Sequence, residues 1–225
     1  MASFLSVGWR IARWAAGRSR TQLPPWVLDR IQRATFRYRY KGRQTIKNPF
    51  DLALYSLLIW RLQPRTIIEI GTNQGGTTLW LADQLTAYGI DGKVHSLDIV
   101  PVVMPPDPRI VLHTGDALQI DKVFPADWLV TQPRPLLVID DGDHSHASVL
   151  TVLDHFGPQM RSGEYIIVED GNVNDLGVAR DFDGGPHRAI VEFLGRGTPF
   201  EIDRSYCDFY GRNVTWNTDG YLRRV

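Results

Sequence analysis

Two short segments combine several carboxylates with histidine in a way that could bind a metal ion. Residues 139–146 read Ile-Asp-Asp-Gly-Asp-His-Ser-His, and residues 168–171 read Val-Glu-Asp-Gly. Each segment follows an apolar run that reads as a strand, and the ends of neighbouring parallel strands lie at one edge of a sheet. Carboxylates that meet there repel one another unless a cation joins them. The two segments therefore predict a site for a hard cation such as Mg²⁺, or else Ca²⁺ or Mn²⁺, with a solvated, metal-free cluster as the alternative.

A glycine-rich turn follows another apolar run, residues 67–70. It reads Gly71-Thr72-Asn73-Gln74-Gly75-Gly76-Thr77. Glycine lets the backbone approach a ligand closely and take conformations that other residues resist. The spacing Gly-x-x-x-Gly-Gly departs from the dinucleotide fingerprint, and the absence of Gly-Lys-Ser or Gly-Lys-Thr excludes a P-loop. The turn favours a nucleotide-like cofactor other than a dinucleotide.

Three acidic residues mark the ends of the first three apolar runs. Glu69 precedes the glycine turn, Asp98 ends the run 94–99, and Asp116 follows the run 110–113. A carboxylate after a second strand can accept hydrogen bonds from ribose hydroxyls. Asp98 or Asp116 alone could instead be a turn residue. The three together predict a site for a nucleoside-containing cofactor.

These acidic residues and the glycine turn resemble those of the class I S-adenosylmethionine-dependent methyltransferases. The resemblance implies that the turn and Glu69 hold the methionine portion of the cofactor, that Asp98 binds the ribose hydroxyls and that Asp116 faces the adenine. The cofactor-binding residues that it implies are Glu69, Gly71, Thr72, Asn73, Gly75, Gly76, Thr77, Asp98 and Asp116.

A more specific resemblance rests on Asp141-x-x-His144 and on Glu169-Asp170 after a Gly-x-Tyr-Ile-Ile-Val strand. This pattern is similar to that of the cephalosporin hydroxylase and rhamnosyl O-methyltransferase family. Macrolide sugar O-methyltransferases share it, as do the actinobacterial sugar O-methyltransferases of the methylmannose polysaccharide pathway. Gly185-Pro186 and the closing Asn217-x-x-Gly220-Tyr221-Leu222 extend the likeness, which covers about residues 48–225.

The family resemblance implies the residues that carry the chemistry. Asp141, Glu169 and Asp170 would hold Mg²⁺ or another divalent cation, with Asp141 also acting in catalysis, and His144 would be the general base. Two alternatives stay open. Asp140 could replace Asp141 as a ligand because the double Asp leaves the register undecided, and His146 could replace His144 as the base.

The resemblance thus implies a metal-dependent S-adenosylmethionine O-methyltransferase whose acceptor is a sugar hydroxyl on a saccharide, polysaccharide or glycolipid. A phenol or catechol methyltransferase is the nearest rival, and a non-catalytic methyltransferase-like docking protein is another. An iron-dependent oxygenase is disfavoured because the chain lacks a clear triad of two histidines and one carboxylate.

Such a reaction needs help at the acceptor oxygen. A hydroxyl is a weak nucleophile near neutral pH, and metal coordination stabilises its alkoxide form. A histidine with its ordinary pKa of roughly 6.5 can take the proton and contribute about 10²–10⁴-fold to the rate. Tyr206, Tyr210 and Trp216 could line an acceptor site or could equally be core residues.

Strands that alternate with helices must position these groups. The alternation predicts an α/β, Rossmann-like methyltransferase fold: a mostly parallel central sheet, helices on both faces and a β-rich C-terminal end. The predicted strands are 67–70, 94–99, 110–113, 136–139, 165–168 and 200–202, with a β-rich tail through 214–216. The predicted helices are 51–62, 77–85, 145–156 and 187–194.

Charge divides the chain into two regions. Residues 1–47 carry eleven Lys or Arg and one acidic residue, a balance of +10, and the remainder carries −10. We therefore expect a basic helical N-terminal arm, 1–47, and a methyltransferase domain, 48–225. An amphipathic helix within residues 4–18 and, after Pro24-Pro25, a second helix to about Tyr40 are predicted. Packing on the body or on a partner subunit in a homo-oligomer is the favoured role; membrane-surface contact is the second, and nucleic-acid binding is not expected.

The overall composition is that of a globular protein. Of 225 residues, 43% are hydrophobic and 22% charged, which excludes a largely disordered chain. The one cysteine, Cys207, excludes an internal disulfide and fits a cytoplasmic protein. No run of eighteen apolar residues occurs, so no membrane span is predicted.

Overall fold

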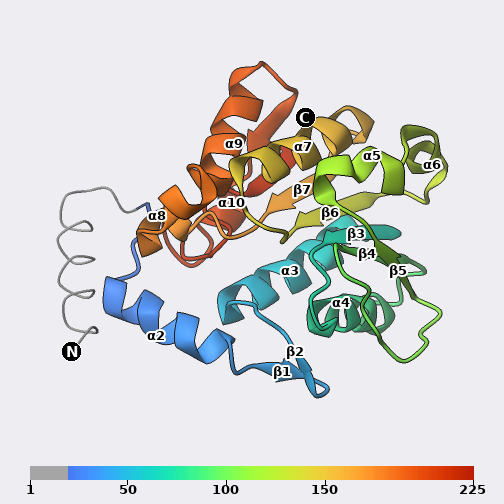
Figure 1. The fold of residues 1–225 in the computed structure, drawn as a ribbon, viewed down its shortest axis with the longest axis horizontal. Helices are drawn as coiled ribbons and strands as arrows, with labels where there is room; N and C mark the ends of the chain where they lie inside the picture. The colour runs from blue at the N-terminus through green and yellow to red at the C-terminus, as the bar shows by residue number, and fades with distance from the viewer. Residues whose placement is uncertain (1–19) are drawn as a thin grey trace.

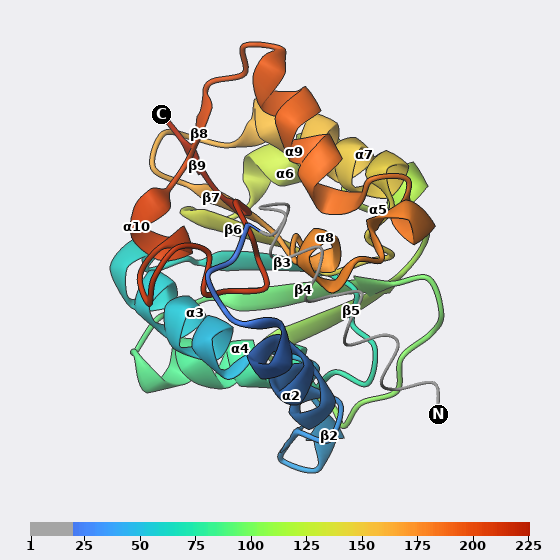
Figure 2. The same cartoon turned by 90° about the vertical axis from the view of Figure 1, so that its left-hand side faces the viewer.

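The computed structural model describes residues 20–225, so the helix predicted within residues 4–18 lies outside the described residues. Figures 1 and 2 show a central sheet with α3 and α4 on one face and α7 and α9 on the other. The strands are β1 Arg39–Tyr40, β2 Arg43–Gln44, β3 Thr66–Ile70, β4 Lys93–Asp98, β5 Ile110–Thr114, β6 Leu136–Asp140, β7 Tyr165–Val168, β8 Phe200–Ile202 and β9 Tyr221–Arg224. The α-helices are α2 Pro25–Thr35, α3 Pro49–Leu62, α4 Gly76–Ala87, α5 Ile120–Val123, α6 Ala126–Thr131, α7 His146–Phe156, α8 Val173–Leu176, α9 Gly185–Gly195 and α10 Arg204–Cys207.

The main sheet has the order β5-β4-β3-β6-β7-β9-β8. The neighbouring strands β5, β4, β3, β6 and β7 pair in parallel, whereas β9 is antiparallel to both β7 and β8. β3 and β6 are neighbours although β4 and β5 separate them in the sequence, so the winding of the chain switches direction between them. Ligands of open α/β sheets bind beyond the carboxyl ends of the strands at this point. The predicted fold class is confirmed.

Apolar side chains cover both faces of the sheet. Every residue of β3 and of β6 is buried, as expected for parallel strands with helices on both sides. One core lies between the sheet and α7 and α9 and includes Phe124 and Phe156. The other lies between the sheet and α3 and α4 and includes Tyr55 and Leu81. These two cores fix the strand ends that carry the acidic residues. Within residues 20–225, no helix has both the length and the apolar character needed to cross a membrane.

Two segments differ from the sequence-based expectation. The second helix of the arm, α2, ends at Thr35, and residues 39–44 form the β1–β2 hairpin, whose turn places Lys41 and Gly42 in the left-handed region. Residues 213–218, expected to continue a β-rich tail, form a loop before β9. The loop begins at Asn213, which is also left-handed, and the side chains of Thr215 and Asn217 form hydrogen bonds to α3.

The β1–β2 hairpin is followed by a segment that packs on the start of α4. A Cβ built on Gly76 would lie 2.1 Å from the carbonyl oxygen of Gln44 and 2.2 Å from Oγ1 of Thr45. A side chain at position 76 would therefore push this segment away. The last glycine of the glycine turn thus has a packing role.

Gly76→Ala should lower the free energy of unfolding by about 1–3 kcal/mol, because the added methyl group overpacks a close backbone contact. Urea unfolding followed by circular dichroism measures this. Gly195→Ala is the matched control, since nothing lies within 4 Å of a Cβ at that position, and it should not destabilise the protein. Equal stability of the two variants would contradict the packing role.

Candidate active site

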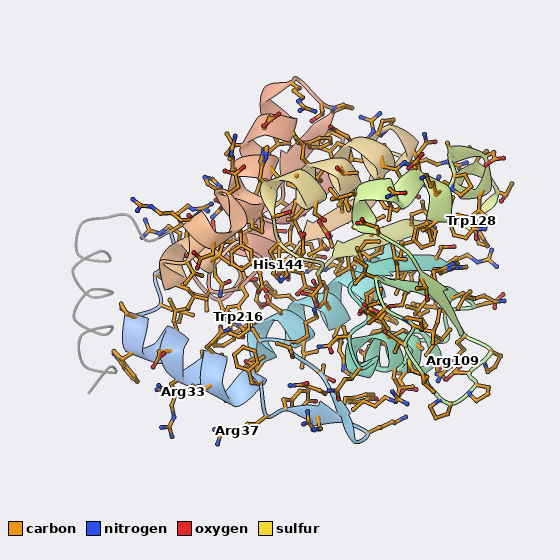
Figure 3. All side chains as sticks on the ribbon, viewed as in Figure 1. Arg33, Arg37, Arg109, Trp128, His144 and Trp216 are labelled. Atoms are coloured by element: carbon orange, nitrogen blue, oxygen red, sulfur yellow. The ribbon has the colours of Figure 1, made fainter. Side chains whose placement is uncertain are left out.

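A cavity of about 530 Å³ opens at the carboxyl edge of the sheet, by the switch point between β3 and β6. The predicted site residues that line it are Gly71, Asn73, Asp98, Asp116, Asp141, His144 and Asp170. Those that do not line it are Glu69, Thr72, Gly75, Gly76, Thr77 and Glu169. Figure 3 shows His144 near the centre of the molecule, between the two helical layers.

Asp98 and Asp116 line the cavity from the ends of β4 and β5 and also order their own loops. Asp98 accepts hydrogen bonds from the backbone N–H groups of Asn73 at 2.7 Å and Val100 at 3.1 Å. Asp116 accepts one from the N–H of Leu118 at 2.9 Å. The turn role considered from the sequence is therefore present, and it coexists with a place in the cavity wall.

Glu69 lies beneath the glycine turn and not in the cavity. Its Oε2 accepts a hydrogen bond from Ser96 Oγ at 2.6 Å and another from Thr78 Oγ1. Its Oε1 is buried and has no hydrogen-bond partner among residues 20–225. Burial raises the pKa of Glu69 to about 7, although the two hydroxyl groups act in the opposite direction. Glu69 thus supports the turn from below and keeps one free acceptor oxygen.

The glycines of the turn allow two close approaches. Gly71 and Gly75 have φ values of +100° and +75°. A Cβ on Gly71 would lie 2.0 Å from the carbonyl oxygen of Asp141, and one on Gly75 would lie 2.2 Å from Sδ of Met104. The turn predicted to bind the cofactor therefore also places the backbone of Asp141. Thr72, which does not line the cavity, fixes the turn through its Oγ1, 2.7 Å from Oγ of Ser96.

Asp141, His144 and Asp170 meet at the cavity wall. Each offers one possible metal-ligand atom, and these atoms all lie within 4.8 Å of one another. Nε2 of His144 is 3.1 Å from Oδ2 of Asp170. Burial by itself would lower the pKa of His144, but the carboxylates of Asp170 and Asp141 outweigh it and raise that pKa above its usual value. The structure thus brings together the predicted base and two of the three predicted metal ligands.

Backbone geometry at these residues is unusual. His144 and Asp170 have φ values of +61° and +52°, in the left-handed region that residues other than glycine rarely adopt. Adjacent residues of a regular strand point to opposite faces of the sheet, so Glu169 and Asp170 can face one site only if the strand has ended before them. β7 does end before them, at Val168. The left-handed residue is Asp170 itself. Gly171 serves another purpose, because a Cβ there would lie 2.5 Å from the carbonyl oxygen of Thr218.

Glu169 is held by two residues that the sequence-based prediction did not place in the site. The hydroxyl of Tyr55 donates a hydrogen bond to Oε1 of Glu169 at 2.7 Å. Nζ of Lys47 lies 2.7 Å from the same carboxylate and also contacts Asp141. Burial would lower the pKa of Lys47, but Asp141 and Glu169 outweigh it and raise that pKa. The charge pattern groups Lys47 with the basic arm. The one sequence feature that indicates a fixed position for Lys47 is the predicted helix that starts just after it.

Helix α3 connects these groups to the C-terminal loop. Asp51 accepts hydrogen bonds from the backbone N–H of Trp216 at 3.0 Å and from the hydroxyl of Thr215. Four residues further along the helix, the hydroxyl of Tyr55 accepts one from Nδ2 of Asn217 at 3.1 Å. One face of α3 therefore joins the segment after β7 to the loop 213–218, and the hydrogen bonds of Asp51 and Tyr55 hold Glu169 in position.

The two alternative residues lie away from the cavity. Asp140 ends β6, and its Oδ2 is buried with no partner among the residues that the structure describes; burial raises its pKa to about 7. His146 is the first residue of α7, and its Nε2 lies 2.8 Å from Glu192 on α9. Of the two pairs of alternatives, Asp141 and His144 are therefore the members that line the cavity.

The family model described as rhamnosyl O-methyltransferase/CmcI matches residues 32–225. The chain belongs to this family. The match begins sixteen residues earlier than the sequence-based resemblance did and takes in Lys47. Family membership confirms the predicted relationship and the predicted class of enzyme, an S-adenosylmethionine-dependent O-methyltransferase.

Individual relatives and solved structures agree with this assignment. The rhamnosyl O-methyltransferase of Mycobacterium leprae is 29% identical over 193 residues, which cover 82% of each chain. That of Mycobacterium bovis is 29% identical over 162 residues, which cover 68% of this chain and 65% of that protein. A CmcI structure with Mg and SAM has 28% identity and a TM-score of 0.67, covering 84% of this chain and 77% of CmcI. An apo structure of CmcI has 27% identity and a TM-score of 0.66, covering 84% and 76%.

Glu69→Gln should weaken the pH dependence of stability. The folded-state pKa of about 7 lies above the ordinary value of 4.5, so the contribution of Glu69 is fully present below pH 4.5 and is lost as the pH rises through 7. Between pH 5 and 8 the variant should therefore lose about 1–3 kcal/mol less stability than the wild type. Urea unfolding in chelator at both pH values measures this.

The control for Glu69 is Glu201→Gln, because Glu201 is an exposed carboxylate paired with Arg223 on the surface. Its variant should follow the wild-type profile. A Glu69→Gln profile parallel to that of the wild type would show that Glu69 does not titrate as a buried group.

Proposed function

We propose that this protein transfers the methyl group of S-adenosylmethionine to a sugar hydroxyl, with Mg²⁺ or another divalent cation bound beside the acceptor. One observation carries the proposal: a single cavity is lined by Asp98 and Asp116, by the Asp141 and Asp170 carboxylates and by His144. The names of the family and of its mycobacterial relatives support a sugar acceptor, with rhamnosides as the first candidates. The solved CmcI complex with Mg and SAM supports the two cofactors.

The donor half of the cavity fits S-adenosylmethionine. Its volume of about 530 Å³ is within the usual range for a small-molecule site, roughly 300–1,000 Å³. Asp98 can accept hydrogen bonds from ribose hydroxyls, and the backbone of Gly71 lies in the wall. The free Oε1 of Glu69 is a further acceptor below the turn. S-adenosylmethionine supplies a methyl group on a positively charged sulfur, which leaves without help from an acid.

The carboxylate group fits a hard divalent cation. Asp141 and Asp170 offer oxygen atoms, which Mg²⁺ prefers, and Glu169 is the adjacent third ligand that the family resemblance implies. Burial raises the pKa of both Asp141 and Asp170, which means that the protein alone disfavours the charged form of each carboxylate. A bound cation would favour the charged forms. The cation supplies positive charge that stabilises the alkoxide form of the acceptor.

His144 accepts the proton of the acceptor hydroxyl in this proposal. The Asp170 carboxylate faces Nε2 of His144 and orients the ring, which leaves Nδ1 to take the proton. The same carboxylates that raise the pKa of His144 stabilise the imidazolium that forms. A positioned base of this kind contributes about 10²–10⁴-fold.

The acceptor half of the cavity is formed by α2 and the C-terminal loop. Gln32, Phe36 and Trp216 line it, and Figure 3 shows Trp216 on the α2 side of His144. The indole N–H of Trp216 and Oε1 of Gln32 are buried and have no hydrogen-bond partner in the part of the chain that the structure describes. One is a donor and the other an acceptor, which matches the two hydrogen-bonding roles of a hydroxyl group. The rings of Phe36 and Trp216 offer apolar faces on which a sugar ring can pack. Tyr206 lies in the core, stacked on Tyr221, and is not part of this half.

Calorimetry with S-adenosylmethionine, followed by a labelled-methyl acceptor screen, tests the function. Binding of the cofactor and methyl transfer to a rhamnoside or another saccharide, abolished by chelator, are expected. Transfer to catechol but to no saccharide would establish the phenol alternative. Absence of cofactor binding with and without Mg²⁺ would contradict the enzyme assignment.

His144→Asn should lower kcat about 10²–10⁴-fold while the cofactor dissociation constant stays within a few-fold. Asn tolerates the left-handed backbone at this position but cannot act as the base. Steady-state kinetics and calorimetry measure both quantities. His146→Asn is the matched control, since its pairing with Glu192 lies outside the cavity. Loss of activity in the control, with activity kept in His144→Asn, would make His146 the base.

Trp216→Phe should raise the KM for the saccharide about 3–10-fold, because it removes one hydrogen-bond donor and keeps an aromatic ring. The melting temperature should not fall by the amount expected for a lost hydrogen bond, since the indole N–H has no partner within residues 20–225. Trp60→Phe, at an exposed position on α3, is the control. An unchanged KM would remove Trp216 from the acceptor half.

Homo-oligomerisation and membrane-surface contact through the arm stay predictions. Within residues 20–47, Arg20 pairs with Asp219 and Lys41 pairs with Asp83 of the body, and these contacts support a packing role for this part of the arm. Size-exclusion chromatography with light scattering tests the oligomeric state.

A further inference from the structure

Lys47 is a buried cation placed between two acidic residues of the proposed metal site. Its side chain is 1% exposed, and its Nζ contacts both Asp141 and Glu169. Lys47 does not line the cavity, whereas Asp141 does. The amine therefore faces the carboxylates from the protein side, where an acceptor molecule does not reach it.

The charges around Lys47 are strongly unbalanced. Four carboxylates end the two neighbouring strands β6 and β7, namely Asp140, Asp141, Glu169 and Asp170. Among residues 20–225, the basic side chains that pair with them are Lys47 and His144. A buried charge that loses its partner is strongly destabilising. In the protein without a divalent cation, Lys47 is therefore the principal compensating charge.

The position of Lys47 is fixed from both sides. Before it, Gln44 and Thr45 pack tightly against Gly76. After it, Asn48 caps helix α3, because its Oδ1 accepts a hydrogen bond from the N–H of Phe50 at 2.9 Å. The backbone cannot withdraw the amine, and the flexible four-carbon stem lets the amine move among neighbouring oxygens.

We propose that Lys47 is the resident counter-ion of the metal site: it neutralises Asp141 and Glu169 while no divalent cation is bound, and it competes with the cation for these two carboxylates. The proposal rests on the proposed function, because the site in question is its metal site. In this scheme Lys47 acts through the charge of the two carboxylates and takes no part in the chemical step. Lys47 keeps the metal-free protein folded and weakens cation binding, so that the bound cation can exchange with cations in solution.

A different role for Lys47 has the opposite consequence. If its hydrogen bonds only orient Asp141 and Glu169 toward the cation, removal of Lys47 weakens cation binding. If it competes, removal strengthens binding, because a like charge leaves the surroundings of the cation. The sign of the change in Mg²⁺ affinity therefore separates the two roles.

The decisive variant is Lys47→Met, which keeps the length of the stem and removes the charge. In chelator its melting temperature should fall by roughly 6–15 °C relative to the wild type. Its Mg²⁺ dissociation constant, measured by calorimetry, should fall at least about tenfold, and saturating Mg²⁺ should restore most of the lost stability. Weaker Mg²⁺ binding, or an unchanged melting temperature in chelator, would overturn the proposal.

Lys41→Met is the matched control. Lys41 also pairs with a carboxylate, Asp83 at 2.7 Å, but its side chain is 59% exposed. Its variant should leave the Mg²⁺ affinity unchanged and lower the melting temperature only slightly, because exposed ion pairs contribute little. If Lys41→Met raised the Mg²⁺ affinity as much as Lys47→Met does, the change would reflect the net charge of the protein and would contradict a specific role of Lys47.

Lys47→Met combined with Glu169→Gln covers the case in which the single variant does not fold. The second change removes one of the two carboxylates that lost their partner, so the double variant should regain about half of the melting temperature lost in chelator. No recovery would overturn the counter-ion role. The proposed function fails in a different way: if wild-type protein binds no Mg²⁺ while Lys47→Met is still destabilised in chelator, the metal site is wrong and the charge compensation stands.

Discussion

The carboxylates at the ends of β6 and β7 impose the constraint that the surroundings of the site must satisfy. Asp140, Asp141, Glu169 and Asp170 are brought together by parallel pairing of two adjacent strands, and their burial removes the water that would otherwise screen them. Balance comes from Lys47 on one side and His144 on the other. The left-handed backbone at two of these positions, the capped start of α3 and the tight packing on the glycine turn all hold the balancing groups in place.

The contacts of Lys47 join the end of the basic N-terminal segment to the acidic ends of β6 and β7. The charge pattern alone separates residues 1–47 from the rest, yet the contacts of Lys47 cross that division, and the family match begins at residue 32. Helix α3 extends the same connection. Asp51 and Tyr55 tie the loop 213–218 to Glu169, so two segments far apart in the sequence depend on one helix face.

The cavity divides into two halves with the carboxylates at their boundary. One half is built on the ends of β3, β4 and β5, as is usual for nucleotide-like ligands of doubly wound sheets. The other is built on α2 and the C-terminal loop, where a buried donor and a buried acceptor lie near two aromatic rings. This division suits a transfer between two bound molecules, because each half can be shaped independently while the reacting groups meet at the boundary. The family supports the chemistry, and in the proposed function the second half is the part that selects the acceptor.

The sequence by itself determined the strands of the parallel core, the acidic residues at their ends and the family pattern, because these depend on local periodicity and on residues adjacent in the chain. The sequence also led to the pairing of Asp141 with His144, three residues apart. The order of the strands in the sheet came from the tertiary structure. Tertiary structure placed Asp141 and His144 in the cavity wall and Asp140 and His146 outside it, since the direction of each side chain depends on backbone turns such as that at His144. It also decided the environment of Lys47 and of Trp216. Both belong to segments without a distinctive motif, and their neighbours in space lie more than ninety residues away along the chain, a separation over which sequence pattern carries no information about contact.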